Sequence, residues 1–214
     1  MPKSPRKIGL IVTGGNPWEI VFSIFHLEKN NYLRLPITVG IGGRSTQESF
    51  FEEDLSRVST SRLEDVKVTG IEAVIIPGGM RLFGKVCDFD TAGKAMRVND
   101  HLKNLLKGIY RLEKPIGAFG PSALVVAKAL QGITRSGPVV TVGNDPRLQS
   151  GIESTGAQSV VTHPGEVVLD ETNKLVTSGG ELGTRRVCDV YAACDNLLSG
   201  LMELIKAGSE HEGY

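Results

Sequence analysis

Cysteine is scarce in this sequence, with three cysteines among 214 residues. Cys87, Cys188 and Cys194 are odd in number and none lies in a C-x-x-C pair, so a disulfide framework is excluded. Unpaired thiols of this kind are typical of a reducing compartment. We therefore expect a cytoplasmic protein.

The sequence also lacks an excess of either charge and lacks long hydrophobic runs. Its 24 Lys and Arg residues balance 24 Asp and Glu residues, and no long basic run stands out. An electrostatic contact with nucleic acid or an anionic membrane is therefore not expected. No run approaches the ~18 apolar residues of a membrane helix, and the stretch from Ile8 to Val12 is too short for a secretory signal.

Two phosphate-binding patterns are missing as well. The segment "TGGNPW" around Gly14 and Gly15 matches neither G-x-G-x-x-G nor G-x-x-x-x-G-K-[ST], and a tight turn into a helix is the preferred interpretation. We expect no cofactor and no metal. A flavodoxin-like nucleotide binder remains the weakest alternative, and it predicts a thermal shift with adenosine nucleotides or flavin.

Strand and helix patterns alternate along most of the chain. Apolar residues make up 40% and charged residues 22%, the profile of a globular protein, and the length suits one domain over residues 1–214. Continuous apolar runs predict buried strands, and apolar residues at helical spacing predict helices. The predicted strands are 7–13, 35–41, 73–76, 116–119, 139–142 and 159–162, and the predicted helices begin at Pro17 and Pro121 or cover 99–113, 145–155 and 185–206.

This alternation predicts an α/β fold, a flavodoxin-like, doubly wound and mostly parallel sheet with helices on both faces. Residues 167–170 and 174–178 flank "DETNK" and predict a small antiparallel hairpin. Ligands of such sheets bind outside the carboxyl ends of the strands. That rule selects three turns, at 14–18, 77–83 and 118–122.

Each turn carries a candidate group. Glu19, in the first turn of a helix, is either a charge that favours the helix dipole or a proton-handling acid. The amides of Gly78 and Gly79 either end a strand or hold an oxyanion. The third turn lies in "KPIGAFGPSALVVAKAL", a strand turning sharply into a helix, and it has no Cys; Ser122 is interpreted as a capping or packing hydroxyl.

Several motifs together resemble the PfpI and class I glutamine amidotransferase-like superfamily. "AVIIPGG" is followed some forty residues later by "KPIGAFGPSAL", and "GKVCDF" and "DETNKLVTS" are similar to its ElbB branch of glyoxalase-like proteins. The resemblance implies a Cys nucleophile at the strand–helix turn, an acid that matches Glu19 and an oxyanion loop that matches Gly78 and Gly79. The Cys position falls on Ala118, and the amidotransferase His-x-Glu pair is missing.

The resemblance leaves two functions open. One is a protein without covalent catalysis that binds a small carbonyl compound or anion, expected to be a homodimer as many relatives are. The other is a glyoxalase-type lyase or amide hydrolase that uses Glu19 as a base and Cys87 as a relocated nucleophile, activated by Arg81 or Lys85. The predicted cleft consists of Gly14, Gly15, Gly78, Gly79, Ala118, Phe119, Gly120 and His163.

Overall fold

A mostly parallel sheet runs through the part of the chain that the computed structural model describes, residues 6–39 and 60–211. Its strand order is β3-β2-β1-β4-β5-β9-β8, and only the β8–β9 pair is antiparallel. The strands are β1 (Lys7–Ile11), β2 (Leu33–Thr38), β3 (Ser61–Arg62), β4 (Ala73–Ile76), β5 (Ile116–Phe119), β8 (Val167–Asp170) and β9 (Leu175–Ser178). A separate parallel pair joins β6 (Val139–Val140) to β7 (Gln158–Ser159).

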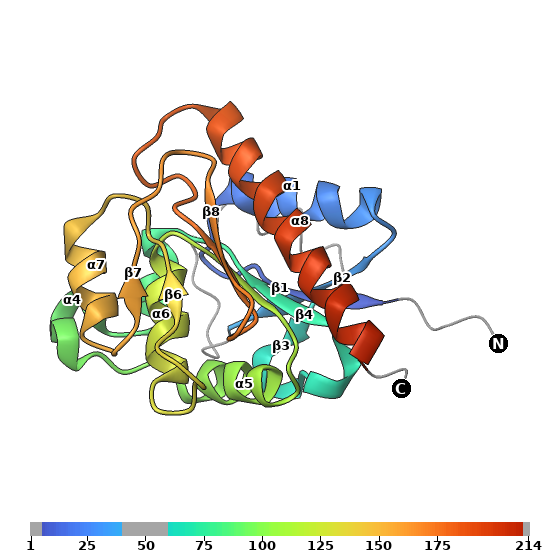
Figure 1. Cartoon of the computed structure of the whole chain (residues 1–214), viewed down its shortest axis with the longest axis horizontal. Coiled ribbons are helices and arrows are strands. Elements are labelled where there is room, and N and C mark those ends of the chain that lie inside the picture. Colours follow the sequence, from blue (N-terminus) through green and yellow to red (C-terminus); the bar gives the residue numbers. More distant parts are fainter. Residues whose placement is uncertain (1–5, 40–59, 212–214) are drawn as a thin grey trace.

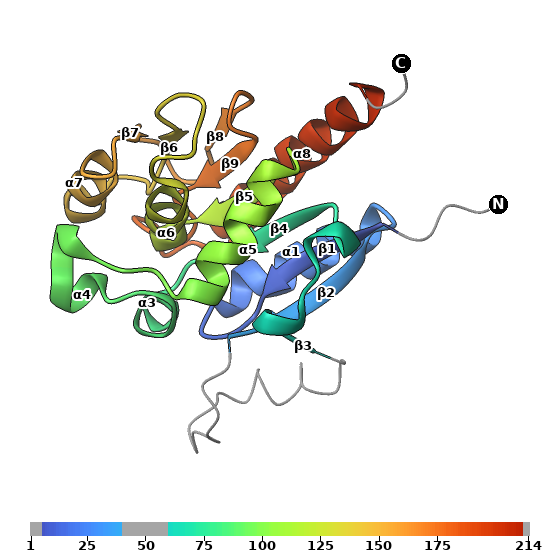
Figure 2. The same ribbon diagram turned by 90° about the horizontal axis from the view of Figure 1, so that it is seen from below.

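Helices cover both faces of this sheet (Figures 1 and 2). The long closing helix α8 (Val187–His211) packs against α1 (Pro17–Lys29) on one face. The other face carries α5 (Asp100–Arg111) and α6 (Pro121–Leu130), with α7 (Pro146–Glu153) against α6. Shorter helices are α3 (Met80–Val86), α4 (Phe89–Ala92), η1 (Leu63–Asp65), η2 (Val68–Gly70) and η3 (Gly93–Ala95).

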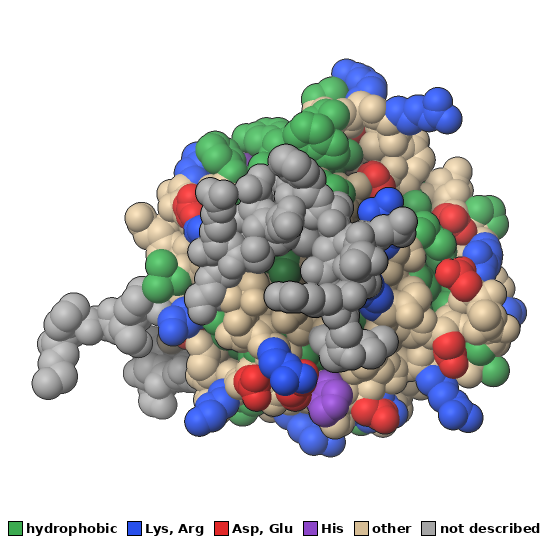
Figure 3. All heavy atoms as spheres, turned by 180° about the vertical axis from the view of Figure 1, so that it is seen from behind, with side chains coloured by type: hydrophobic (Ala, Val, Ile, Leu, Met, Phe, Trp, Pro, Cys, Tyr) green, Lys and Arg blue, Asp and Glu red, His purple; other side chains and the backbone are tan. Residues whose placement is uncertain are grey.

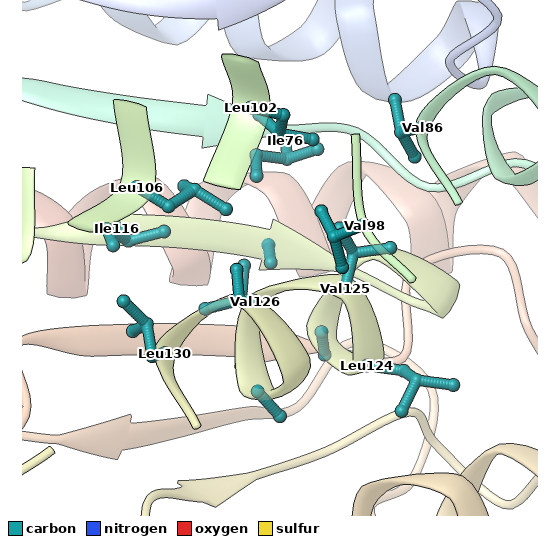
Figure 4. Close-up of a cluster of buried hydrophobic side chains, with 14 of the residues drawn as sticks. Ile76, Val86, Val98, Leu102, Leu106, Ile116, Leu124, Val125, Val126 and Leu130 are labelled. Atoms are coloured by element: carbon teal, nitrogen blue, oxygen red, sulfur yellow. The ribbon is translucent and has the colours of Figure 1, made fainter. Parts of the chain in front are cut away.

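The two faces of the sheet form two hydrophobic cores. Successive side chains of a strand point to opposite faces, so Val74 and Ile76 of β4 join the core beneath α5 and α6, while Ala73 and Ile75 join the core beneath α1 and α8. Burial on both faces explains why β4 and β5 are continuous apolar runs. Figure 4 shows part of the first core, with Ile76, Ile116, Leu102, Leu106, Val125 and Val126 grouped together.

Helix α1 starts where its sequence predicts. Pro17 occupies a first-turn position, where its missing N–H costs no hydrogen bond. The side-chain oxygen of Asn16 accepts the backbone N–H groups of Trp18 and Glu19 at 2.9 and 3.1 Å, which caps the helix. This cap fixes the entry of α1 and, with it, the position of Glu19 above the sheet.

The predicted fold is confirmed, including the antiparallel hairpin. The predicted strands at 139–142 and 159–162 are shorter, as β6 and β7, and pair with each other outside the main sheet. Residues 40 and 41 of the predicted strand 35–41 lie outside the described residues. The single domain over 1–214 stays a prediction.

Among the described helices, none is both long and apolar enough to span a lipid bilayer. Hydrophobic side chains are nevertheless exposed along one surface, which Figure 3 shows near the top of the rear face. They belong to α1 and the first part of α8. Trp18 and Phe25 are 51% and 50% exposed, and Val21, Val187 and Tyr191 are exposed beside them. We call these five residues the α1/α8 apolar face.

Candidate functional site

Four loops meet at the carboxyl ends of β1, β4, β5 and β9. The first two, predicted from their Gly-Gly pairs, pack backbone to backbone: the amide of Asn16 donates to the carbonyl of Gly78 at 2.7 Å. A Cβ atom at Gly79 would lie 3.1 Å from the Asn16 nitrogen and 3.2 Å from the Gly14 oxygen. Glycine at 79, where φ is +116°, permits this close approach.

Glu19 lies at the centre of this edge and is fully buried. Its Oε2 atom accepts the backbone N–H of Gly78 at 2.6 Å, and its Oε1 atom accepts the N–H of Glu181 at 3.1 Å. Burial raises the pKa of the Glu19 carboxyl to about 8, although the two amides act in the opposite direction. The carboxyl is therefore largely protonated at neutral pH, and the Gly78 amide, predicted as an oxyanion donor, already bonds to it.

The fourth loop, after β9, covers Glu19, and its place at this edge was not predicted from the sequence. Gly180 has φ of +58°, and a Cβ there would lie only 2.2 Å from Glu19 Oε1. The side chain of Asn16 donates a hydrogen bond to the carboxylate of Glu181, which fastens the loop to the start of α1. A signal was available: "TSGG" places Gly-Gly after a strand, as "VTGG" and "IPGG" do.

The sharp turn between β5 and α6 is made by Gly120, which has φ of +49° and ψ of −124°. Ala118, where the bend was expected, lies two residues earlier inside β5, pairs with Ile76 and Thr177, and is buried in the core beneath α5 and α6. The reason is Pro121: it begins the helix, so the preceding residue must take the turn, and its positive φ favours glycine.

Phe119 and Ser122, which flank this turn in the sequence, both contact the loop after β4. The buried Ser122 hydroxyl donates to the Pro77 carbonyl at 2.6 Å, so it joins α6 to the loop after β4, in agreement with its predicted packing role. Phe119 is buried beneath α1 and α8. Its carbonyl oxygen would lie 3.0 Å from a Cβ at Gly78, so Phe119 contributes backbone to this edge.

Cys87 and His163 lie elsewhere. Cys87 follows α3, is half-buried and forms an isolated β-bridge with Val98. Burial, and to a lesser extent Asp88 and Asp90, raises the pKa of its thiol to about 11, so the expected activation by Arg81 or Lys85 is wrong. His163 is exposed in the loop between β7 and β8, where its backbone N–H donates to the carboxylate of Glu166 at 2.8 Å. Among the described residues, no hydrogen bond or ion pair joins His163 to Glu19.

The other two thiols lie on α8. Cys194 is buried, and its Sγ atom lies 3.9 Å from the backbone oxygen of Glu19. Burial raises the pKa of this thiol. Cys188 is exposed at the start of α8. Among the described residues, no three His, Cys, Asp or Glu side chains are grouped to bind a metal.

Several curated proteins share sequence with this chain, whereas no family model matches it. Identity is 27% over 133 residues with the human glutamine amidotransferase-like class 1 domain-containing protein 3, mitochondrial, covering 58% of this chain and 48% of that protein. It is 24% over 140 residues with the ES1 protein, mitochondrial, of Danio rerio (60% and 50%), and 23% over 159 residues with its Rattus norvegicus homolog (70% and 58%). The chain thus matches about half the length of these relatives.

Solved structures share the fold. An isoprenoid biosynthesis protein with an amidotransferase-like domain from Ehrlichia chaffeensis superposes with a TM-score of 0.76 at 19% identity, covering 92% of this chain and 99% of that one. Glyoxalase III from Candida albicans gives 0.59 at 13% identity (91% and 97%), and Drosophila melanogaster DJ-1β gives 0.54 at 16% identity (95% and 97%).

The doubly wound, mostly parallel sheet with helices on both faces defines a flavodoxin-like α/β protein, in which the sharp strand–helix turn and the Glu19 carboxyl group lie at the strand ends. The chain is similar in sequence to glutamine amidotransferase-like class 1 and ES1 proteins, and it shares its fold with PfpI-like and DJ-1 proteins.

The comparisons also correct the expected location. The three curated relatives are mitochondrial proteins by name, which contradicts the cytoplasmic location predicted for this chain. That prediction rested on the scarcity of cysteine. Few unpaired thiols indicate a reducing environment, but they do not identify the compartment.

Proposed function

We propose that this protein is an ElbB-like member of the PfpI and class I glutamine amidotransferase-like superfamily. It binds a small carbonyl compound or anion and acts as a regulatory protein without covalent catalysis. The observation that carries the proposal is the absence of a thiol at the strand–helix turn. Gly120 makes the turn, Ala118 precedes it, and the three cysteines lie elsewhere. A missing covalent nucleophile commonly lowers the rate by about 10⁴ to 10⁶.

The hydrogen bonds of Glu19 support the same proposal. Both of its carboxyl oxygens accept backbone amides, and the loop around Gly180 and Glu181 excludes water from it. A carboxyl held in this way stabilises the meeting of three loops and is not directed at a substrate. The ligand is then expected at the rim of the same edge, outside the carboxyl ends of the strands.

One observation favours an enzyme instead. The pKa of Glu19 is raised to about 8, which lies close to the pH at which a general acid or base works best. The alternative is therefore a glyoxalase-type lyase or a hydrolase of small carbonyl compounds in which Glu19 transfers the proton. Cys87, with its raised pKa and its position after α3, is a poor nucleophile for that reaction.

Methylglyoxal turnover separates the two functions. We expect wild-type protein to consume methylglyoxal no faster than a buffer blank, and to show saturable binding of pyruvate, a small anionic carbonyl compound, by calorimetry. Measurable turnover that is lost in Glu19→Gln would overturn the proposal in favour of the lyase. Turnover lost in Cys87→Ser would assign the reaction to the relocated thiol, and absence of both turnover and pyruvate binding would reject this ligand class.

We also propose that the protein is a homodimer in which the α1/α8 apolar face meets the same face of a second copy. Large exposed apolar patches commonly mark interaction surfaces, and a two-fold interface places one patch against its own copy. None of the five side chains of this face is charged, so self-association brings no like charges together. Phe22 of α1 stacks on Trp18 of the same helix and contacts Tyr191 of α8 edge to face.

Light scattering coupled to size exclusion tests the dimer. We expect twice the mass of the 23.0 kDa chain for wild type. Phe25→Glu places a charge on the apolar face and should give the mass of one chain, whereas Leu33→Glu, at an exposed residue of β2, should leave the dimer intact. A wild-type monomer, or a Phe25→Glu dimer of undiminished stability, would contradict this interface.

A further inference from the structure

A cavity lies at the opposite edge of the sheet from Glu19. Its volume is about 150 Å³, and its walls include Tyr110 and Arg111 at the end of α5 and Lys174 just before β9. Since β5 and β9 run parallel, the residues that precede them share the amino-terminal edge of the sheet. Figure 1 shows the tip of the β8–β9 hairpin reaching the end of α5 there. This cavity is separate from the site of the proposed function.

Hydrogen bonds between separate segments hold the walls of the cavity in place. The hydroxyl of Tyr110 donates a hydrogen bond to the side-chain oxygen of Asn173 at 3.2 Å. It also accepts one from the backbone N–H of Arg135 at 3.0 Å. Asn173 is fully buried, and its side chain donates to Asp170 at 2.8 Å. Three separate segments, the end of α5, the loop after α6 and the β8–β9 turn, are thereby joined around one cavity.

Positive charge dominates the lining. Arg111, Arg135 and Lys174 supply three cations against a single carboxylate, Glu113, which pairs with Arg135. In the described part of the chain, neither Arg111 nor Lys174 forms an ion pair with an acidic residue. Charges of one sign in a concave site attract a ligand of the opposite sign.

The end of α5 does not oppose an anion in this position. Helix carboxyl ends carry partial negative charge on their last carbonyl groups. Here, those carbonyls are occupied: Gly108 accepts the amide of Leu112, Ile109 that of Lys114, and Tyr110 that of Glu113. The cations therefore set the potential of the cavity.

We propose that this cavity binds a phosphate group, either inorganic phosphate or the phosphate of a small phosphomonoester. Guanidinium groups match phosphate oxygens in bidentate geometry, and a Lys ammonium adds a point charge. Arg111 and Lys174 contact the phosphate from two walls of the cavity. Arg135 turns part of its guanidinium from the ion pair with Glu113 toward the phosphate. Thr172, at the hairpin turn, adds a hydroxyl to the same lining.

Calorimetric titration at constant ionic strength tests this site, with sodium phosphate and glycerol phosphate as the two probes and sodium chloride as the balancing salt. We expect saturable binding of at least one probe by wild type, and at least tenfold weaker binding by the double variant Arg111→Gln, Lys174→Gln. The control Lys206→Gln, an exposed charge on α8, should bind as wild type does. Tighter binding of glycerol phosphate than of phosphate identifies a phosphomonoester site, and the reverse order identifies a phosphate site.

Either of two results would overturn the proposal: no saturable binding of either probe, or equal affinity in wild type and the double variant. Circular dichroism shows whether the double variant is folded, and Arg111→Gln alone, at an exposed position, tests the site if Lys174→Gln disturbs the hairpin. Glu19→Gln should leave phosphate binding unchanged. Failure of this proposal is thus distinguishable from failure of the proposed function.

Discussion

The carboxyl group of Glu19 accepts the backbone amide of Gly78 at 2.6 Å across 59 residues of sequence, inside a site with no access to water. This relationship ties the first helix to the loop after β4. The burial of Glu19, which outweighs the opposite effect of this hydrogen bond, keeps its carboxyl group protonated at a pH where most carboxyls are ionised. The pH dependence of stability follows from it.

Stability should fall as the pH rises from about 4.5 to about 8. The unfolded chain releases the Glu19 proton near its ordinary pKa of 4.5, whereas the folded protein holds it up to about 8. Between these values the folded state binds more protons, so the free energy of unfolding decreases with pH and levels above 8. At about 1.4 kcal/mol per pKa unit, the loss amounts to several kcal/mol.

Urea unfolding of wild type and Glu19→Gln across this pH range measures that loss. The glutamine cannot titrate, so the difference between the free energies of unfolding of the two proteins should change with pH. Gln also weakens one of the two accepted hydrogen bonds, but that effect is the same at every pH. Glu203→Gln, at an exposed residue of α8, is the matched control and should parallel wild type. Parallel curves for wild type and Glu19→Gln would show that folding does not raise the pKa of Glu19.

Gly120→Ala should destabilise the protein by about 1–3 kcal/mol, because a side chain disfavours its positive φ. The added Cβ would also lie 3.2 Å from both the Gly179 carbonyl oxygen and a Leu182 methyl group. Gly208→Ala, in α8 with no atom within 4 Å, should instead be neutral or stabilising by up to about 1 kcal/mol. Thermal unfolding compares the two variants, and an equal effect of both would remove the special role of the Gly120 turn.

Ser122→Ala should cost about 1–3 kcal/mol because it leaves the buried Pro77 carbonyl without its 2.6 Å hydrogen bond. The exposed Ser209, whose hydroxyl donates to Ile205 in α8, provides the comparison. Its replacement by alanine should change the free energy of unfolding by less than about 0.5 kcal/mol. A Ser122→Ala variant as stable as wild type would indicate that water reaches the Pro77 carbonyl.

Thiol labelling should follow exposure and pKa. At neutral pH iodoacetamide should modify the exposed Cys188 first, because the raised pKa of Cys87 leaves almost no thiolate there. Labelling of Cys87 should increase as the pH approaches 11, while Cys194 should react only on unfolding. Peptide mass spectrometry follows each site, and fast labelling of Cys87 at neutral pH would revive it as a nucleophile.

Local patterns account for most of the fold and for part of the site. Pro17 and Asn16 fix the start of α1, and the apolar runs of β4 and β5 indicate strands buried on both faces. These elements could be predicted because each signal acts within a few residues of the chain. Glu19, Gly78 and Gly79 could be assigned to one edge, since parallel strands end on the same side of a sheet. The loop after β9 escaped notice because its strand was recognised only as half of a hairpin.

The sequence by itself determined the order and type of the elements, the parallel sheet with its antiparallel hairpin, and the absence of a thiol from the strand–helix turn. Only the tertiary structure decided that Gly120 and not Ala118 makes that turn, that Gly180 and Glu181 cover Glu19, and that Glu19 is buried enough to stay protonated. Periodicity and capping depend on neighbours in the chain. Burial and pKa depend on residues such as Glu181, which the fold brings from 162 positions away.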